Sequence, residues 1–248
     1  MLFFCIYSKM KERSGIKIGL TPKERRFFMI KAVIFDMDGT IFDTEVVYRK
    51  SWVTAAKEMG LEIDILSELP NITGRNHANT AQYFAEQYGT DFPFAQLFAT
   101  MWKHSDRVLE TNVPPRPYIP EALESLRADG YLLAIASSTN RERVNRYLTV
   151  SGFAHYFDAV ISGERVKNGK PAPDIFLLTA ETLGVSPEEC VVVEDSRQGV
   201  LAGINAGMPT VMIPEFQPCT EDLKKGLWLC LDTAKELPER IAKYNASF

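Results

Sequence analysis

The 248-residue sequence predicts an α/β fold, a doubly wound parallel sheet with an inserted small all-helical domain. Three features predict it: short apolar runs without polar alternation, helical stretches between these runs, and one long segment with helical patterns but no convincing strand. Apolar runs of this kind are typical of strands buried on both faces of a parallel sheet, and their alternation with helices implies right-handed crossovers.

Short apolar runs are the predicted strands of the sheet. They are Ala32–Phe35, Tyr131–Ala136, Ala159–Ile161, Val191–Val193 and Thr210–Ile213. Start and stop signals mark the helices between them. Pro120 stands in the first turn of a helix that Gly130 stops, and the predicted helices Pro173–Leu183 and Arg197–Ala206 each end directly before a glycine.

Residues 43–112 form the helical insertion. The spacing of apolar side chains predicts helices at Glu45–Met59, His77–Tyr88 and Phe94–Glu110. An insertion after the first strand lies above the carboxyl edge of the sheet, where doubly wound proteins bind ligands. We therefore predict a helical cap domain at residues 43–112 over a core formed by residues 29–42 and 113–248.

Residues 1–28 differ in charge from the rest of the chain. They hold seven Lys or Arg against two Glu, a net charge of +5, so the other 220 residues carry −9 of the total of −4. The apolar run Leu2–Tyr7 precedes the basic residues, whereas a signal peptide has the opposite order. We predict a disordered basic extension without a role in function, and Met29 as an alternative start directly before the first strand.

The composition excludes several classes of protein. Hydrophobic residues are 46% and charged residues 24% of the chain, which excludes collagen-like and disordered chains. No apolar run approaches the roughly 18–20 residues that span a bilayer. The 28 Lys and Arg against 32 Asp and Glu demand no nucleic-acid partner. From the charge balance and the short apolar runs we predict neither nucleic-acid nor membrane partners. Four widely spaced cysteines without a C-x-x-C pair predict reduced thiols in a cytoplasmic protein.

Asp36 and Asp38 carry the strongest chemical signal. They directly follow the predicted strand Ala32–Phe35, and residues two apart in an extended chain point to the same side. Carboxylates at the edge of a sheet are costly unless they are paired or bind a metal. A calcium loop would need a carboxylate at its twelfth position, where this chain has Val47. The alternative is that Asp36 and Asp38 are exposed acids of a turn and have no function.

Hydroxyl groups and a lysine follow other predicted strands. The segment 137–140, Ser-Ser-Thr-Asn, opens a helix, where hydroxyl and free N–H groups suit a phosphate. Taken alone this signal is weak, because Ser and Asn are also common helix caps. Lys170 precedes a proline-initiated helix. A nucleotide-binding P-loop is excluded, because Glu164 and Pro171 occupy the positions that need Gly and Ser or Thr.

Glu194 and Asp195 set two adjacent acids at the end of the predicted strand Val191–Val193. Without partners they would repel each other, so a bound cation is the economical explanation. All four strand ends together hold an acid pair, phosphate-binding hydroxyl groups, a lysine and a cation site. That set is typical of phosphoryl transfer, in which positioning and charge neutralisation supply most of the catalysis.

These segments resemble, in order, the four motifs of the haloacid dehalogenase-like hydrolase superfamily. The matches include Phe-Asp-Met-Asp-Gly-Thr at 35–40, Asp-Thr-Glu at 43–45, Gly-Lys-Pro-Ala-Pro-Asp at 169–174 and Glu-Asp-Ser at 194–196. With the helical insertion, they are similar to the small-cap branch of phosphoglycolate-type phosphatases, sugar-phosphate phosphatases and beta-phosphoglucomutases. The resemblance runs from about Met29 to the carboxyl terminus and implies a Rossmann-like catalytic core.

The resemblance implies a role for each motif residue. Asp36 would attack phosphorus and form an aspartyl-phosphate, and Asp38 would act as general acid and then as general base. Mg²⁺ would be held by Asp36, Asp38 through its backbone carbonyl, and Asp195, with Glu194 in support. The phosphoryl oxygens would be bound by Ser137, Ser138 and Lys170.

The implied substrate is a small phosphate ester, and the implied protein is a monomer. Residues of the cap and of loops near the motifs would select the substrate. The candidates are Arg75, Lys103, Asn140 and Arg141. For Arg75 and Arg141 the alternative is an ordinary surface or helix charge.

Three functions remain open from the sequence. Beta-phosphoglucomutases typically carry a cap histidine and a cap-loop arginine, where this chain has Tyr48 and His77. These departures favour a phosphatase acting on sugar phosphates over a hexose-phosphate mutase. A non-catalytic phosphate-binding protein on the same fold is the third possibility, and it is disfavoured because every catalytic acid is present.

Overall fold

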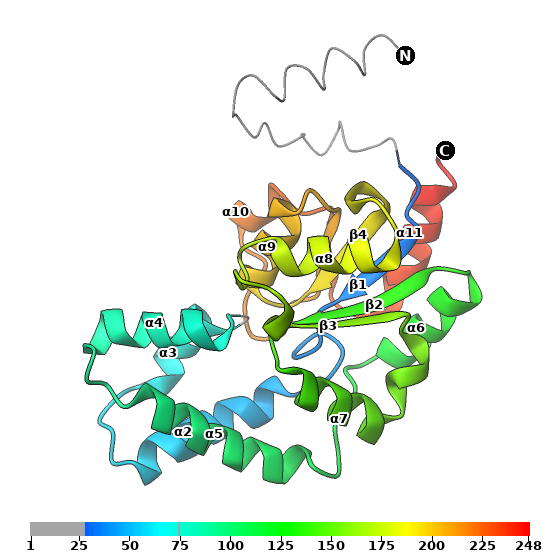
Figure 1. The fold of residues 1–248 in the computed structure, drawn as a ribbon. Helices are drawn as coiled ribbons and strands as arrows, with labels where there is room; N and C mark the ends of the chain where they lie inside the picture. The colour runs from blue at the N-terminus through cyan, green and yellow to red at the C-terminus, as the bar shows by residue number, and fades with distance from the viewer. Residues whose placement is uncertain (1–27, 74) are drawn as a thin grey trace, which may run out of the picture.

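A computed structural model describes residues 28–73 and 75–248 and confirms the predicted α/β fold. Parallel strands form a six-stranded sheet in the order β3-β2-β1-β4-β5-β6 (Figure 1). They are β1 (Ala32–Phe35), β2 (Leu132–Ser137), β3 (Ala159–Ser162), β4 (Cys190–Glu194), β5 (Thr210–Met212) and β6 (Leu229–Cys230). Because β1 lies in the middle and the order reverses there, the sheet is doubly wound.

Two groups of helices accompany the sheet. The insertion between β1 and β2 begins with α2 (Glu45–Glu58), α3 (Ile65–Ile72), α4 (His77–Tyr88) and α5 (Phe94–Leu109). The helices around the sheet are α6 (Ile119–Ala128), α7 (Arg141–Ser151), α8 (Asp174–Leu183), α9 (Arg197–Asn205), α10 (Glu221–Lys224) and α11 (Leu237–Asn245). Short 3₁₀ turns are η1 (Phe153–Tyr156), η2 (Gly163–Arg165), η3 (Pro187–Glu189) and η4 (Ala234–Glu236).

Alternate side chains of β1 pack into different apolar layers. Ala32 and Ile34 belong to the layer that includes residues of α8 and α9. Val33 and Phe35 belong to the layer that includes residues of α6, α7 and α11. Since helices cover both faces of the sheet (Figure 1), the strand is apolar at every position rather than at every second one.

Helices α2–α5 lie beyond the carboxyl edge of the sheet (Figure 1). Aromatic rings fill the space between them: the ring centroid of Phe84 lies 5.2 Å from those of Phe92 and Phe94. The two connections to the core run side by side, since the N–H of Asp43 donates to the carbonyl of Pro114 at 2.9 Å. The domain boundaries stay a prediction, and we use "cap" for residues 43–112.

Several elements are missing from the sequence prediction. Pro70 lies inside α3 and interrupts the helical pattern, because proline removes a backbone donor. The edge strand β6 has two residues and α10 has four, which is too short for a periodic signal. The last helix, α11, was also missed. Strand ends shift by a residue, so Ser137 ends β2 instead of following it.

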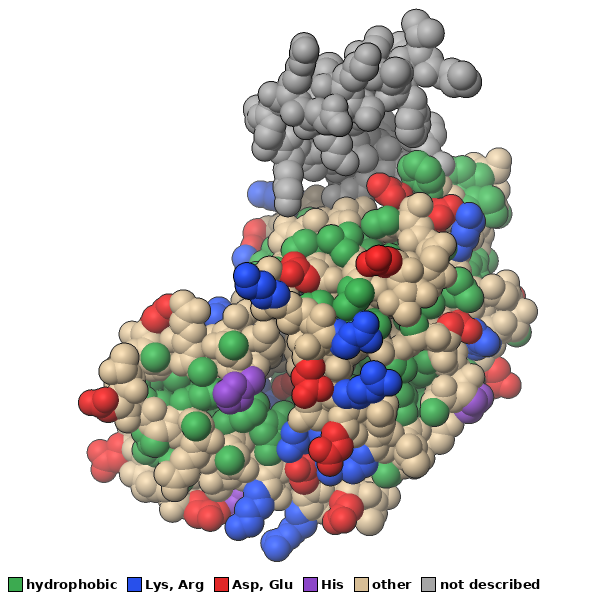
Figure 2. Space-filling model, in the orientation of Figure 1, with side chains coloured by type: hydrophobic (Ala, Val, Ile, Leu, Met, Phe, Trp, Pro, Cys, Tyr) green, Lys and Arg blue, Asp and Glu red, His purple; other side chains and the backbone are tan. Residues whose placement is uncertain are grey.

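The surface of the described residues has mixed charge. Figure 2 shows basic and acidic side chains interspersed over the core on the face in view. Within residues 28–73 and 75–248, every helix is too short or too polar to cross a bilayer. The predicted extension, residues 1–28, lies outside the described residues except for Phe28.

Candidate active site

Buried charged residues meet at the carboxyl ends of β1, β2 and β4. Asp36 follows β1, and its N–H donates to the carbonyl of Val193 at 2.9 Å, which extends the pairing of β1 with β4. Glu194 ends β4, so its side chain and that of Asp36 lie next to each other. Parallel pairing therefore brings together residues that are 158 positions apart in the chain.

Lys170 binds two of these carboxylates at once. Its Nζ lies 2.5 Å from Oδ1 of Asp36, 2.5 Å from Oε1 of Glu194 and 3.2 Å from the carbonyl oxygen of Ala136. The residue is 1% exposed. Burial alone would lower the pKa of Lys170, but the charges of Asp36 and Glu194 outweigh this effect and raise the pKa. The lysine is therefore a permanent cation behind Asp36.

Glu194 is fixed by hydrogen bonds on both oxygens. Oε1 accepts from Lys170, and Oε2 accepts from the N–H of Asp195 at 3.1 Å and from the hydroxyl of Ser196 at 3.1 Å. Gly199 makes room for it, because a Cβ at this position would lie 1.7 Å from Oε1 of Glu194. Glu194 therefore serves to hold Lys170 and the loop after β4.

Asp36, Glu194 and Asp195 form a buried acidic cluster. They each offer a carboxylate oxygen, and these oxygens lie within 4.8 Å of one another. Burial raises the pKa of Asp36, as does the negative charge of Glu194, and the same two causes raise the pKa of Asp195. Three carboxylates against the single ammonium of Lys170 leave an excess of two negative charges. A divalent cation with a preference for hard oxygen ligands fits this set.

Asp38 accepts hydrogen bonds from three hydroxyl groups. Thr44 and Tyr48 donate to Oδ1 at 2.8 and 2.7 Å, and Thr139 donates to Oδ2 at 2.8 Å. The hydroxyl of Tyr48 also lies 3.1 Å from that of Tyr147 on α7. Burial raises the pKa of Tyr48 further above its usual range, so it remains a donor. The side chain of Asp38 is therefore oriented by Thr44 and Tyr48 of the cap and by Thr139 in the loop after β2.

A cavity of about 110 Å³ lies between this edge of the sheet and the cap. Its core side is lined by Asp36, Asp38, Ser137, Ser138, Thr139 and Asp195. Its apolar cap side is lined by Trp52, Leu69, Ile72, Phe98, Met101 and Trp102. A ligand whose phosphoryl group met the core side would thus place the rest of its structure against the cap.

The haloacid dehalogenase-like hydrolase family model matches residues 33–213, which include all of these charged residues. The chain belongs to this family. It is 35% identical over 179 residues to fructose-1-phosphate phosphatase YqaB of Escherichia coli (strain K12), which covers 72% of this chain and 94% of the relative. It is 33% identical over 184 residues to the phosphorylated carbohydrates phosphatase of Thermotoga maritima, with 73% and 84% covered.

A solved structure of similar fold is beta-phosphoglucomutase of Clostridium difficile. The TM-score is 0.74 at 24% identity, with 88% of this chain and 98% of that chain covered. This similarity shows the shared fold. Family membership confirms that the chain is a hydrolase-type enzyme and that the motif resemblance was correctly identified.

The structure brings most of the sequence-predicted residues of this hydrolase together. Asp36, Asp38, Ser137, Ser138, Arg75 and Asp195 line the cavity, and Lys170 and Glu194 lie directly behind Asp36. Lys103 and Arg141 are exposed and do not line this cavity. Asn140 is the N-cap of α7, where its Oδ1 accepts from the N–H of Arg143 at 3.0 Å. In the structure Asn140 therefore caps α7, and it is not among the residues that line the cavity.

Sequence reasoning missed the residues that orient Asp38 and join the cap to the core. Thr44, Tyr48 and Thr139 have no shared spacing, since they lie 6, 10 and 101 residues from Asp38. Asp106 of α5 accepts from Arg143 of α7 at 3.0 and 2.8 Å. These contacts join elements that are far apart in the chain. Helical i, i+4 spacing and the residues at strand ends describe single elements, so neither pattern can reveal such contacts.

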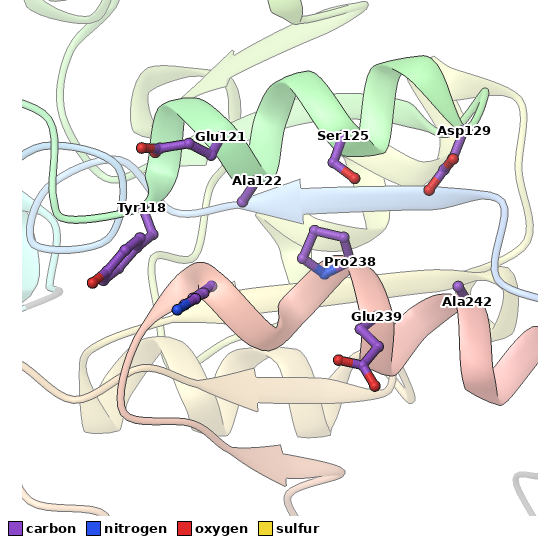
Figure 3. A pocket seen from close by; sticks show the side chains of 9 residues that line it. Tyr118, Glu121, Ala122, Ser125, Asp129, Pro238, Glu239 and Ala242 are labelled. Carbon is purple, nitrogen blue, oxygen red and sulfur yellow. The ribbon is translucent and has the colours of Figure 1, made fainter.

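A second hollow lies between α6 and α11 and has a volume of about 360 Å³. Figure 3 shows Glu121, Ser125 and Asp129 on one side of it, and Pro238 and Glu239 on the other. None of the clustered carboxylates lines it. The smaller cavity is therefore the candidate active site, because it joins the acidic cluster to the cap.

Proposed function

We propose that this chain is an Mg²⁺-dependent phosphatase that hydrolyses a small sugar phosphate through an aspartyl-phosphate intermediate. The observation that carries the proposal is the contact of Lys170 with Asp36 inside the buried acidic cluster, with Asp38 lining the same cavity. A nucleophile, a proton carrier and a cation are thus present within one site.

Mg²⁺ fits the residues present. Asp36 and Asp195 offer carboxylate oxygens, and within the described residues the Asp195 carboxylate accepts one hydrogen bond, from Thr40 at 3.3 Å. Gly39 packs against the cluster, since a Cβ there would lie 2.4 Å from Oδ2 of Asp195. Bound Mg²⁺ supplies the positive charge that lets a carboxylate approach an anionic phosphate. Glu194 contributes by fixing Lys170 and the loop that carries Asp195.

The first step breaks the ester bond. A carboxylate oxygen of Asp36 attacks phosphorus, the bond between phosphorus and the leaving oxygen breaks, and the carboxyl proton of Asp38 moves to that oxygen. Lys170 stabilises the charge beside the nucleophile, and Ser137 and Ser138 bind the phosphoryl oxygens. The products of this step are the free alcohol and an aspartyl-phosphate on Asp36.

The second step restores the enzyme. Asp38, now a carboxylate, removes a proton from a water molecule as the water oxygen attacks phosphorus of the aspartyl-phosphate. The bond between phosphorus and Asp36 breaks and inorganic phosphate leaves. The sugar class of the substrate rests on the names of the two relatives, which act on fructose 1-phosphate and on phosphorylated carbohydrates.

Release of inorganic phosphate tests the proposal. The purified chain is incubated with Mg²⁺ and a panel of esters that includes fructose 1-phosphate, other hexose phosphates and phenyl phosphate. Hydrolysis that stops on addition of EDTA and returns with excess Mg²⁺ is expected, and Asp36→Asn should abolish it. A protein that binds phosphate but releases none from any ester would overturn the proposal.

The mutase hypothesis gives a different result in the same assay. A mutase would form glucose 6-phosphate from beta-glucose 1-phosphate in the presence of the sugar bisphosphate, with little free phosphate. We expect free phosphate to exceed glucose 6-phosphate. If glucose 6-phosphate exceeded free phosphate, the enzyme would be a mutase, which uses the aspartyl-phosphate to move a phosphoryl group between positions of the sugar.

A further inference from the structure

Tyr147 is a buried core residue whose hydroxyl group has no part in the two proposed steps. It lies on α7 and is fully buried. Its ring packs edge-on against that of Phe42, with the ring centroids 6.4 Å apart. Phenylalanine would fill the same space, and a hydroxyl group removed from water is costly unless it is hydrogen-bonded. Packing alone therefore does not account for tyrosine at this position.

The protons of two hydroxyl groups define the direction of a hydrogen-bonded chain. The hydroxyl oxygens of Tyr147 and Tyr48 lie 3.1 Å apart, and Tyr48 donates to Oδ1 of Asp38 at 2.7 Å. A tyrosine hydroxyl has one proton, and that of Tyr48 is used in the bond to Asp38. The bond between the two tyrosines must therefore use the proton of Tyr147, so Tyr147 donates to Tyr48 and Tyr48 donates to Asp38.

Both tyrosines keep their protons. Burial, and then the negative charge of Asp38, raise the pKa of Tyr147 and the pKa of Tyr48 above their usual range. A hydroxyl group that accepts one hydrogen bond is a stronger donor in the next, because neighbouring bonds polarise each other. The hydroxyl of Tyr147 thus strengthens the bond between Tyr48 and Asp38 without a contact of its own with Asp38.

The chain joins the cap to the core. Tyr48 lies on α2 of the cap, whereas Tyr147 lies on α7 and Thr139 lies in the core loop that precedes α7. Thr139 donates to the other carboxyl oxygen of Asp38, Oδ2, at 2.8 Å. Tyr147 does not line the cavity, whereas Tyr48, Asp38 and Thr139 do. Tyr147 can therefore act on the cavity only through its neighbours.

We propose that Tyr147 is a positioning residue for proton transfer, because its hydrogen bond to Tyr48 fixes the carboxyl group of Asp38 in the cavity. This inference rests on the phosphatase function proposed above. The transferred protons are those of Asp38 in the first step and of water in the second, and both tyrosines keep theirs. Without the hydroxyl of Tyr147, the hydroxyl of Tyr48 could turn away from Asp38, and proton transfer to the leaving oxygen would become less efficient.

The leaving group separates this role from a purely structural one. The leaving oxygen of a sugar is strongly basic and needs the proton of Asp38, whereas p-nitrophenolate is weakly basic and leaves without it. The value of kcat/KM covers the steps up to the loss of the leaving group. The ratio of kcat/KM for the best hexose phosphate of the panel to that for p-nitrophenyl phosphate therefore measures the contribution of Asp38 as an acid.

Tyr147→Phe tests the inference because it keeps the ring and removes only the hydroxyl group. We expect kcat/KM for the hexose phosphate to fall about three- to tenfold, as for the loss of one hydrogen bond. The value for p-nitrophenyl phosphate should change less than about twofold. Tyr48→Phe should lower the ratio at least as far, and the double variant should equal Tyr48→Phe within about twofold, because Tyr147 acts through Tyr48.

Tyr131→Phe is the matched control. It removes a hydroxyl group that accepts from Nδ2 of Asn245 at 3.1 Å, outside the cavity. This variant should keep the wild-type ratio. Thermal unfolding is measured for every variant, since a loss of folded protein lowers both values of kcat/KM alike and leaves their ratio unchanged.

The outcomes separate this inference from the proposed function. If the wild-type protein hydrolyses both esters and Tyr147→Phe keeps the wild-type ratio, Tyr147 does not position Asp38, and the phosphatase function stands. Effects of Tyr48→Phe and Tyr147→Phe that multiply in the double variant would also overturn the inference. If the wild-type protein releases phosphate neither from p-nitrophenyl phosphate nor from any sugar phosphate, the phosphatase function itself is wrong.

Discussion

The two sides of the cavity differ in how their polar groups are held. On the core side, Lys170 is 1% exposed, and Glu194 is fully buried with hydrogen bonds on both oxygens. On the cap side, aromatic and aliphatic side chains surround a few polar groups, and Glu45 forms no hydrogen bond with another described residue. The core side is therefore fixed before a substrate arrives, whereas the cap side leaves groups available to it.

Burial explains this difference. A charge removed from water must be paired, so each carboxylate of the core side has a fixed neighbour or a site for a cation. Glu45 at the cap has no such partner; partial burial, and then the negative charge of Asp38, raise its pKa from 4.5 to about 8, which favours the uncharged form of the carboxyl group. We therefore expect the chemical step to depend on the core side and substrate recognition to depend on the cap side.

Replacement of Lys170 with Met should disrupt the core side most severely. Met has a similar length but no charge, so Asp36 and Glu194 would stay buried without their shared cation. Loss of one partner of a buried ion pair costs about 3–5 kcal/mol of unfolding free energy. The rate of phosphate release should fall by about 10³-fold or more. Thermal unfolding and initial rates measure the two effects.

Lys167→Met is the control for this change. Lys167 is exposed and lies three residues earlier in the same loop. Its loss should change neither the unfolding temperature nor the rate. Activity of Lys170→Met close to that of the wild type would show that the ammonium group has no part in catalysis.

Gly199→Ala tests whether the position of Glu194 matters. An added Cβ would lie 1.7 Å from Oε1 of Glu194, so the carboxylate and Lys170 would have to move. Overpacking of this kind costs about 1–3 kcal/mol. We expect a drop in kcat of about tenfold to accompany the lower stability, because the ammonium group moves with Glu194. Gln198→Ala, at the neighbouring position, should have neither effect.

Gly169→Ala tests the joint between the two sides. A Cβ at 169 would lie 2.3 Å from Nδ2 of Asn76, which belongs to the cap. The added methyl group should hold the cap away from the loop of Lys170 and raise KM about three- to tenfold, with a smaller change in unfolding free energy. Steady-state kinetics and thermal unfolding distinguish the two.

Asn76→Gly should reverse the effect of Gly169→Ala. It removes the side chain that the new methyl group meets, and Gly replaces an Asn N-cap at a cost of only a few tenths of a kcal/mol. Asn76 is the N-cap of α4, where it accepts from the N–H of Asn79 at 2.9 Å. If the double variant keeps the raised KM, the cap and core do not meet at this contact during turnover.

The sequence carried enough information to predict the core side of the site. Asp36, Lys170 and Asp195 each follow or precede a clear strand or helix signal, and parallel strands align such residues at one edge. Strand order was not needed, because every carboxyl end lies on the same side of the sheet. The residues that meet at this edge could therefore be named before any contact was known.

The cap side could not be predicted in the same way. The hydrogen bond from Tyr48 to Asp38 and the contact of Arg49 with Phe216 join elements whose relative position depends on the packing of α2 to α5. Apolar spacing identifies a buried helix face, but it does not say which neighbour covers that face. Asn140 illustrates the same limit, because a cap residue and a substrate-binding residue have the same sequence signal.

The smallest expected effect is at Glu215, which lies in the loop after β5 and interacts with Asp43 at the start of the cap. Burial, and then a hydrogen bond with Asp43, raise the pKa of Glu215 from 4.5 to about 8. The folded protein keeps a proton that the unfolded chain releases above about pH 4.5. The stability this proton contributes is present at low pH and is lost as the pH rises to about 8.

Glu215→Gln should therefore flatten the dependence of stability on pH. The amide keeps an N–H donor toward Asp43 at every pH, as the protonated acid does only at low pH. We expect the variant to lose about 1 kcal/mol less than the wild type between pH 5 and pH 8, since Arg116 at 3.4 Å partly stabilises the charged form. Urea unfolding at several pH values in EDTA measures this, with the exposed Glu221→Gln as control. Parallel pH curves for wild type and Glu215→Gln would contradict this prediction, because they would mean that Glu215 is charged in the folded protein beside Arg116.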